Sequence, residues 1–428
     1  MKVTQKNQKV NRKKVLMVSY DISQKDGYFY SEYESADKIY CLEDIVDNNP
    51  RAIKNHYLEL DDICSRLGFE NIHIFFEPSG GYENIFKRLA FKKHYEVNYV
   101  SGEATRKARV IESNDDSKSD DKDKRIILTL AQLSKVLSCR NLPETYSQLR
   151  QLGLYYEDVS NIGVIFRTQI SDIAKSIFPE QAVKSRFLYS VTGTVIIKKF
   201  GFNPHKIVKH GYSSFKYRMK NSIPRVSEKS LKSIFRKAGA AKELLSEAEA
   251  EIIEKQLMWH YKKYEEISER KEEFKEEMCE LYKTLPEYDK FSQIKQISDD
   301  MMARVVAETG PIADFSCLAK LMRYAGLNIR IKESGKFKGQ NKISKKGRSL
   351  LRKILFQIVF SYLIKKGKLY NEYFYAKKDA GVKGMIIMTN IMRKTLKMLY
   401  GVYVSTMTFD IDRVHKNNTE YIKIEKAV

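Results

Sequence analysis

The feature that most constrains the fold is a series of short apolar runs that alternate with helix-like segments near the N-terminus. Residues 15–18 and 72–76 are apolar runs of strand length, and residues 28–33, which are rich in aromatics, and residues 96–100 are also expected to be strands. Between the first two, residues 53–67 carry apolar side chains at helical spacing and stop at Gly68. Because strands that alternate with helices form a sheet covered by helices, we expect an α/β domain over residues 14–142.

Acidic residues follow two of these strands, and two more begin the next expected helix. Asp21 and Glu77 come after apolar runs. Asp120 and Asp123 are three residues apart at the start of an amphipathic helix, which places them on one face. Converging carboxylates repel one another unless cations lie between them, and such sites bind divalent metals that act on phosphodiesters. We therefore expect all four acids to bind Mg²⁺ or Mn²⁺ and to be catalytic; the alternative is that each is an ordinary exposed acid.

The middle of the chain contains two long stripes of apolar residues at helical spacing. Residues 143–285 hold both stripes, with a smaller helical insert near 181–225. The second stripe is rich in Glu and Lys, which favours two charged helices in an antiparallel coiled-coil arm, with an ordinary helical bundle as the alternative. Residues 286–428 are expected to form a compact, mostly helical C-terminal domain, and residues 1–13 a basic tail.

A glycine-rich, lysine-dense loop in the C-terminal region contains Ser334 directly before Gly335. Glycine lets the backbone approach a phosphate closely, and lysines attract nucleic acid by releasing counterions. Ser334 is therefore a candidate nucleophile towards a phosphodiester; the alternative is a hydroxyl that only contacts phosphate. The basic residues expected to bind nucleic acid are Lys118, Lys332, Lys336, Lys338, Lys342, Lys345, Lys346 and Arg352.

The overall charge points to a polyanionic partner. Lys and Arg number 77 against 54 Asp and Glu, a formal net charge of +23, which favours nucleic acid over a merely soluble basic protein. The five cysteines form no C-x-x-C pair, so neither a disulfide framework nor a zinc site is expected, and a reducing cytoplasm fits. No apolar run reaches the roughly 18 residues of a membrane span, so we expect a cytoplasmic protein that is associated with the nucleoid and has no membrane partner.

These motifs, in this order, resemble those of the DEDD-type insertion-sequence transposases, which are related to the Piv DNA invertases and are described as bridge-RNA-guided recombinases. Three segments are similar to the family's acidic motifs: residues 17–21, residues 76–82 and residues 118–123, where serine replaces the usual threonine. In the C-terminal region, residues 324–327 (Tyr-Ala-Gly-Leu) and residues 334–347 are similar to the family's signature and its spacing. The resemblance covers nearly the whole chain between residues 14 and 402.

The resemblance implies a fold and a mechanism. It implies an RNase H-like (RuvC-type) domain, a coiled-coil arm and a transposase domain whose serine nucleophile is Ser334. The carboxylates would hold Mg²⁺, and the serine would form a covalent phosphoserine bond with a cleaved DNA strand. The implied partners are donor and target DNA, a structured noncoding guide RNA, and further copies of the chain in a dimer or tetramer with composite active sites.

Two departures from the family pattern accompany the resemblance. Residues 298–300 (Ser-Asp-Asp) stand where the family has a glycine hairpin, so a helix–hairpin–helix phosphate contact is not expected. The chain is also longer than the family norm, chiefly near residues 181–220. Two alternative functions remain: a metal-dependent nuclease or junction resolvase without serine chemistry, and a non-catalytic nucleic-acid-binding scaffold.

Overall fold

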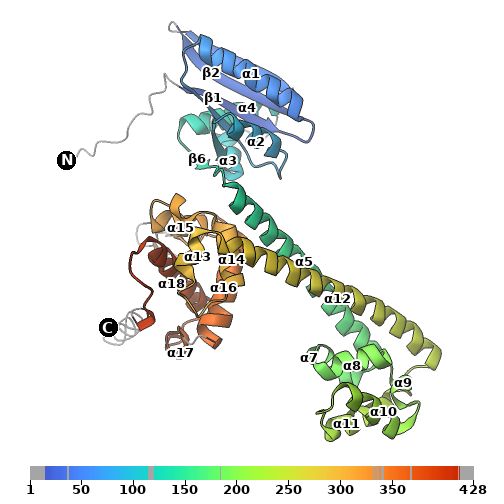
Figure 1. Ribbon diagram of the computed structural model, residues 1–428. Helices are drawn as coiled ribbons and strands as arrows, with labels where there is room; N and C mark the ends of the chain where they lie inside the picture. Colours follow the sequence, from blue (N-terminus) through green and yellow to red (C-terminus); the bar gives the residue numbers. More distant parts are fainter. Residues whose placement is uncertain are drawn as a thin grey trace. The chain divides into compact units, whose positions relative to one another are not determined.

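The computed structural model (Figure 1) describes residues 15–35, 38–113, 120–183, 185–330, 333–334, 337–338, 342–366, 369–412 and 414. The chain divides into two compact units, Met1–Asn141 and Leu142–Val428. In the described part of the chain, no helix is long and apolar enough to cross a membrane. Some predicted features lie outside the described residues: the basic tail 1–13, Lys118, Lys332 and Lys336, and the side chains of Asp120, Ser334 and Lys338.

A six-stranded mixed sheet forms the centre of the N-terminal unit. Its strands are β1 (Val15–Ile22), β2 (Asp26–Ser35), β3 (Lys38–Asp47), β4 (Asn71–Phe76), β5 (Glu96–Val100) and β6 (Val136–Ser138). They lie in the order β3-β2-β1-β4-β5-β6. The first three pair antiparallel, β1, β4 and β5 pair parallel, and β6 is antiparallel to β5. The α/β class predicted for this region is confirmed.

Two strands of this sheet were not predicted. β3 lies at the edge of the sheet and pairs only with β2, and its Ile39, Tyr40 and Ile45 side chains are exposed. An edge strand with a solvated face lacks the continuous apolar run that marks a buried parallel strand. β6 has only 3 residues, too few for an alternating pattern to be visible.

Helices cover both faces of the sheet. They are α1 (Pro50–Arg66), α2 (Asn84–Lys92), α3 (Gly102–Ser113) and α4 (Asp120–Gln132). Leu16, Val18 and Tyr20 of β1 share one core with α1 and α2. Met17 packs against the other core, which includes residues of α4. Because successive side chains of a strand point to opposite faces, Asp21 lies on the same face as Met17, towards α4.

A pair of long helices begins the second unit. α5 (Glu144–Ile177) and α12 (Glu247–Lys283) pack along their lengths (Figure 1). The rings of Tyr155 and Phe274 lie 5.7 Å apart, and those of Phe166 and Trp259 lie 6.1 Å apart. The residue number on α5 rises from 155 to 166 between these two contacts, while the number on α12 falls from 274 to 259, so the two helices are antiparallel. We call this pair the arm.

Six short helices join the distal ends of the arm. They are α6 (Pro179–Ala182), α7 (Ser185–Leu188), α8 (Val191–Phe200), α9 (Pro204–Val208), α10 (Gly211–Ser222) and α11 (Glu228–Ala241). Phe200, Phe202 and Phe215 belong to their core, which also takes in Ile170 of α5 and Leu257 of α12. We call residues 178–246 the helical head.

The rest of the second unit is mostly helical, as expected for the C-terminal region. Its elements are α13 (Pro286–Phe291), α14 (Asp299–Thr309), η2 (Ile312–Asp314), α15 (Leu318–Tyr324), β7 (Ile329–Arg330), β8 (Glu333–Ser334), β9 (Phe337–Lys338), β10 (Lys342–Ile343), α16 (Ser349–Ile358), the π-helical segment η3 (Val359–Lys366), α17 (Asn371–Asp379) and α18 (Gly384–Val404). Every residue of α14 from Met301 to Thr309 is buried. Ser298 precedes this helix, and Asp299 and Asp300 occupy its first turn, where the helix dipole favours acids.

Candidate active site

The strand register brings two of the predicted acids together at one edge of the sheet. β1 and β4 run parallel, and Tyr20 lies opposite Phe76. Asp21 and Glu77 directly follow Tyr20 and Phe76, and the backbones of neighbouring strands in a sheet are about 4.8 Å apart. Both acids are half-buried. The pairing of β1 with β4 therefore places these two acids next to each other at the carboxyl ends of two parallel strands.

Asp123 lies on the first turns of α4 and is bound by an arginine. Arg109 of α3 donates from Nε to Oδ1 and from Nη2 to Oδ2 of Asp123, each over 2.6 Å. The Asp123 side chain is 3% exposed and that of Arg109 13%, so water screens this pair little. Such a bidentate pair fixes the guanidinium plane as well as its position.

The charges of the two strand-end acids, Asp21 and Glu77, also affect the pKa of Arg109. The hydrogen bonds from Arg109 to Asp123 raise the pKa of Arg109 most, against the lowering effect of burial. The charges of Asp123, Glu77 and Asp21 raise this pKa further. Three of the four predicted carboxylates therefore act on the charge of one arginine, Asp123 through direct hydrogen bonds and Glu77 and Asp21 through their charges. The fourth, Asp120, is three residues before Asp123 on α4, and its side chain lies outside the described residues.

A glycine lets Glu77 reach this centre. A Cβ atom at Gly102, the first residue of α3, would lie 2.5 Å from Oε1 of Glu77. That distance is shorter than any real contact of a Cβ atom, so a larger residue would displace the carboxylate. Glu77 therefore lies directly against the N-terminus of α3, the helix that also carries Arg109.

Further contacts hold α4 and the glycine turn in place. The hydroxyl of Ser19 on β1 lies 2.6 Å from the carbonyl oxygen of Lys124, and Lys124 Nζ pairs with Glu43 on β3 at 3.0 Å. Glu83 accepts hydrogen bonds from Ser79 Oγ at 2.9 Å and from the Gly81 amide at 3.0 Å. Burial acts to raise the pKa of Glu83, but these hydrogen bonds and that of its own amide outweigh burial and lower it. The turn after Glu77 is therefore fixed by a charged carboxylate.

The base of the Ser334 loop is built from two backbone segments in close contact. β7 and β10 pair antiparallel, with Ile329 opposite Ile343, and β8 pairs with β9, with Ser334 opposite Phe337. The amide of Lys345 donates to the carbonyl of Gly326 over 3.1 Å. These pairings close the loop at its base.

Two glycines allow this close approach. Gly326 has a φ of +68° and Gly347 a φ of +151°, a range that favours glycine. A Cβ atom at Gly347 would lie 2.4 Å from the carbonyl oxygen of Tyr324. The guanidinium of Arg352 donates to the carbonyls of Ala325 and Gly347, over 3.0 and 3.2 Å. Arg352 thus ties the two segments together.

A buried polar network supports the Tyr-Ala-Gly-Leu segment from below. Arg348 forms a bidentate pair with Glu308 of α14, at 3.0 and 2.9 Å, and the Glu308 side chain is 3% exposed. Tyr324 Oη donates to the carbonyl of Glu308 over 2.9 Å. Arg150 of α5 donates to the same carbonyl over 2.7 Å. The loop base is therefore anchored to both α14 and the arm.

Comparison with protein families identifies the chain. Residues 50–179 match a family model of transposases of the DEDD type, and residues 288–375 match the transposase IS116/IS110/IS902 family. The chain belongs to this family of insertion-sequence transposases. It is a DNA transposase or recombinase, and its substrates are DNA. A search of curated proteins found no match.

The two matched segments of the transposase contain most of the candidate site. Glu77, Asp120 and Asp123 fall in the first match and Ser334 in the second, whereas Asp21 precedes both. Neither match covers residues 180–287, which include most of the helical head and the whole of α12. The family resemblance and these matches agree on the class of enzyme.

DEDD transposases typically use divalent metal ions, and the donor set here is of the appropriate kind. Asp21, Glu77 and Asp123 offer only carboxylate oxygens, which hard cations such as Mg²⁺ prefer. As they stand, no three His, Cys, Asp or Glu side chains in the described ranges are close enough to hold a metal ion. The positive charge among these acids belongs instead to Arg109. These carboxylates can therefore bind a divalent ion once the hydrogen bonds between Arg109 and Asp123 are broken.

The structure describes part of the predicted nucleic-acid-binding set of the transposase. Lys342, Lys345 and Lys346 are exposed. Arg352 is half-buried, and burial lowers its pKa while its guanidinium serves the loop base. Whether Arg352 and the lysines contact nucleic acid stays a prediction.

Sequence reasoning did not identify Arg109 or Gly102 as site residues. The sequence indicated only a charged stretch over residues 104–124, yet α3 covers the first part of it, residues 104–113. The available signal was the spacing of Thr105 and Arg109, four residues apart and so on one helical face, while Arg106 and Lys107 are exposed. Thr105 is fully buried, which marks that face as the inner one.

Proposed function

We propose that this transposase cuts and rejoins DNA strands through Ser334, with Mg²⁺ held by Asp21, Glu77, Asp120 and Asp123, and that a structured RNA guides it to donor and target DNA. The observation that carries the proposal is that Asp21, Glu77 and Asp123 all act on the charge of Arg109, Asp123 through direct hydrogen bonds. Three remote segments supply these acids, and acids would not converge in this way without a positive charge between them.

The sheet topology supports an RNase H-like assignment of the N-terminal unit. Three antiparallel strands, β1 to β3, continue into parallel strands β4 and β5 on the other side of β1. Asp21 lies near the end of the central strand β1, Glu77 follows β4, and α4 supplies the next acids on the face of the sheet that it covers. Ligands of open α/β sheets bind at the carboxyl ends of the strands, where these acids lie.

The residues of the transposase would divide the work as follows. The Oγ of Ser334 attacks the phosphorus of a DNA phosphodiester and loses its proton to water. The P–O bond to the neighbouring nucleotide breaks, and the departing oxygen takes up a proton to give a free hydroxyl end. The other strand end stays joined to the serine. A hydroxyl end of a second strand then attacks this phosphoserine, which restores a DNA phosphodiester and the serine hydroxyl.

The carboxylates act by holding the divalent ion. When bound, Mg²⁺ would polarise the phosphate and stabilise the charge that develops during displacement. Arg109 must release Asp123 for this carboxylate to become a ligand. The glycine at position 102 keeps Glu77 in place, and Ser19 keeps α4 in place against β1.

The serine and the carboxylates belong to different compact units of the chain, which suits a composite site. Asp21, Glu77 and Asp123 lie in Met1–Asn141, and Ser334 lies in Leu142–Val428. In the proposed homo-oligomer, a dimer or tetramer, the serine of one subunit serves the carboxylates of another. RNA guidance rests on the family resemblance, and its test is whether recombination requires a transcript from the DNA that flanks the gene.

A strand-exchange assay tests the chemistry. Ser334→Ala should abolish covalent protein–DNA linkage, and Asp21→Asn should abolish cleavage. Ser349→Ala, at an exposed position on α16, is the matched control and should leave both unchanged. Full covalent linkage in Ser334→Ala or full cleavage in Asp21→Asn would overturn the proposal.

One observation favours the alternative of a nuclease or junction resolvase without serine chemistry. The acids and their cation lie wholly within the N-terminal unit. In that case, Ser334→Ala would cleave DNA at the normal rate and form no covalent intermediate, whereas Asp21→Asn would still be inactive.

A further inference from the structure

The helical head carries a large share of the net charge of the chain. Residues 178–246 contain 15 Lys and Arg but only 3 acids, Glu180, Glu228 and Glu243. This excess of 12 positive charges compares with +23 for all 428 residues. Since neither family match covers residues 180–287, the charge is not accounted for by the matched transposase segments.

Much of this charge has no internal counter-charge. In the described part of the head, Lys216 and Lys232 pair with Glu228, while Lys198 and Lys206 pair with acids of α12. Six other basic residues of the head are exposed and form no ion pair with any described residue: Arg186, Lys220, Arg225, Lys229, Arg236 and Lys242. Unpaired surface cations attract polyanions at long range.

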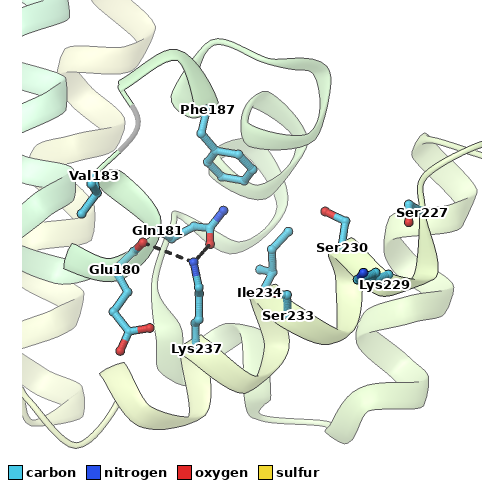
Figure 2. Close-up of a pocket in the computed structure, with 10 residues that line it drawn as sticks. All are labelled: Glu180, Gln181, Val183, Phe187, Ser227, Lys229, Ser230, Ser233, Ile234 and Lys237. Atoms are coloured by element: carbon cyan, nitrogen blue, oxygen red, sulfur yellow. Dashed lines mark hydrogen bonds between the residues drawn. The ribbon is translucent and has the colours of Figure 1, made fainter.

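The helical head also contains a pocket, and one of these six cations, Lys229, lines it. It has a volume of about 790 Å³ and lies between α11 and the segment that contains α6 and α7 (Figure 2). Phe187 points into it from α7, and Ser230, Ser233 and Lys229 line it from α11. Lys237 closes one side, where its Nζ lies 3.4 Å from the carbonyl of Glu180 and 3.5 Å from Gln181 Oε1.

The lining of this pocket suits one unpaired nucleotide. The ring of Phe187 provides an aromatic face for a base, and base–aromatic stacking tolerates any sequence. Lys229 provides a cation for a phosphate, and the serine hydroxyls can donate to phosphate or sugar oxygens. A base in a duplex is stacked between its neighbours and would first have to be extruded, so a single strand fits better.

We propose that the helical head binds single-stranded nucleic acid, with one unpaired nucleotide in the pocket between Phe187 and α11 and the flanking phosphates on the exposed Lys and Arg residues. The inference goes beyond the proposed function, because it assigns a binding site remote from the carboxylates and the serine. It does not depend on serine chemistry or on metal.

Binding measurements on the full-length chain test the surface part of the proposal. Fluorescence anisotropy in EDTA would compare a single-stranded DNA, the same sequence as RNA, and a blunt DNA duplex. Reversing two exposed charges of α11 by Lys229→Glu and Arg236→Glu should weaken single-strand binding roughly tenfold. The same change should lower the slope of log affinity against log salt by about 1.4, since each lost phosphate contact removes about 0.7.

A variant of equal charge provides the control. Lys255→Glu with Lys262→Glu makes the same change at two exposed positions of α12 outside the head, and should alter single-strand affinity less than threefold. Equal losses in both double variants would show a general charge effect and overturn the proposal. A preference for RNA or for DNA would identify which kind of single strand the head binds, and either preference supports the proposal.

Filling the pocket tests the nucleotide seat itself. Ser230 is exposed at the pocket, so Ser230→Trp should block it without disturbing the core. We expect a loss of at least fivefold in single-strand affinity, no change for the duplex, and an unchanged thermal unfolding midpoint. Unchanged single-strand affinity, an equal loss for the duplex, or displacement of the oligonucleotide by polyglutamate at equal charge would overturn the proposal. Because no cleavage is measured, a failure here is distinguishable from a failure of the recombinase mechanism.

Discussion

Arg109 holds both oxygens of Asp123, through hydrogen bonds of 2.6 Å each, in a setting where the Asp123 side chain is 3% exposed. Asp21 and Glu77 lie close enough to raise the pKa of the same guanidinium. The candidate active site thus contains a cation of its own, although one guanidinium against three carboxylates leaves it net negative. A divalent ion that binds there has to compete with a side chain of the protein itself.

Replacing this arginine should separate stability from metal binding. Arg109→Gln leaves a buried carboxylate without its partner, so the free energy of unfolding should fall by about 3 kcal/mol in EDTA. The variant should also bind Mn²⁺ more tightly, because the competing cation is gone. Chemical denaturation with and without Mn²⁺, together with calorimetric titration, measures both effects. Arg106→Gln, at an exposed position of the same helix, is the control. Weaker Mn²⁺ binding in Arg109→Gln would contradict the prediction.

Adding one methyl group beside Glu77 should impair catalysis. In Gly102→Ala, the new Cβ atom would lie 2.5 Å from Glu77 Oε1, so the carboxylate must move. A displacement of about 1 Å in an active site can cost up to about 100-fold in rate, and we expect a loss of at least tenfold in DNA cleavage. Gly239→Ala in α11, where no atom lies within 4 Å of the new Cβ, should cleave normally. Equal cleavage by both variants would show that Glu77 does not need its observed position.

The base of the serine loop should be sensitive to a second glycine. Gly347→Ala forces a Cβ atom to within 2.4 Å of the carbonyl of Tyr324, at a φ of +151°. We expect covalent serine–DNA linkage to fall more than tenfold, while the thermal unfolding midpoint falls by only a few degrees. The control is Gly384→Ala, where nothing lies within 4 Å of the new atom. The idea fails if the Gly347 variant forms the linkage at the wild-type rate.

Acid should destabilise the N-terminal unit through a buried histidine. Burial lowers the pKa of His56 to about 4, against a small opposing effect of Asp44. The unfolded chain takes up this proton near pH 6.5 but the folded chain does not, so stability is lost as the pH falls from 6.5 towards 4. Between pH 7 and pH 5, this group should cost about 2 kcal/mol. Denaturant titrations at both pH values, compared with His56→Gln, measure it; an equal pH dependence in the variant would refute the assignment.

Sequence patterns predicted the part of the site that depends on buried strands. β1 and β4 are apolar because both of their faces are covered, so their ends at Asp21 and Glu77 could be recognised. The pairing of Tyr20 with Phe76, which brings the two acids level, is a property of the sheet and not of either segment. The helical spacing of Asp120 and Asp123 was also visible, and α4 begins at Asp120.

The remaining parts depend on contacts that sequence spacing does not reveal. Arg109 follows Arg106 and Lys107, and only the packing of α3 distinguishes it from these exposed neighbours. Gly347 lies close to Tyr324 although the whole Ser334 loop separates the two residues in the sequence, so no local pattern predicts this contact. β3 was not predicted because it is an edge strand that pairs only with β2. Several of its apolar residues are exposed, so its sequence lacks the pattern of a buried strand.

The length of the arm has a practical consequence for mapping the DNA. α5 contains 34 residues, so at 1.5 Å per residue it is about 50 Å long; its first half packs against the C-terminal helices and its last turns belong to the core of the head. With 3.4 Å between successive base pairs, that distance matches roughly 15 base pairs of double helix. Footprinting of an assembled complex should therefore show two protected patches, one at the cut and another roughly 15 base pairs away, with accessible backbone between them.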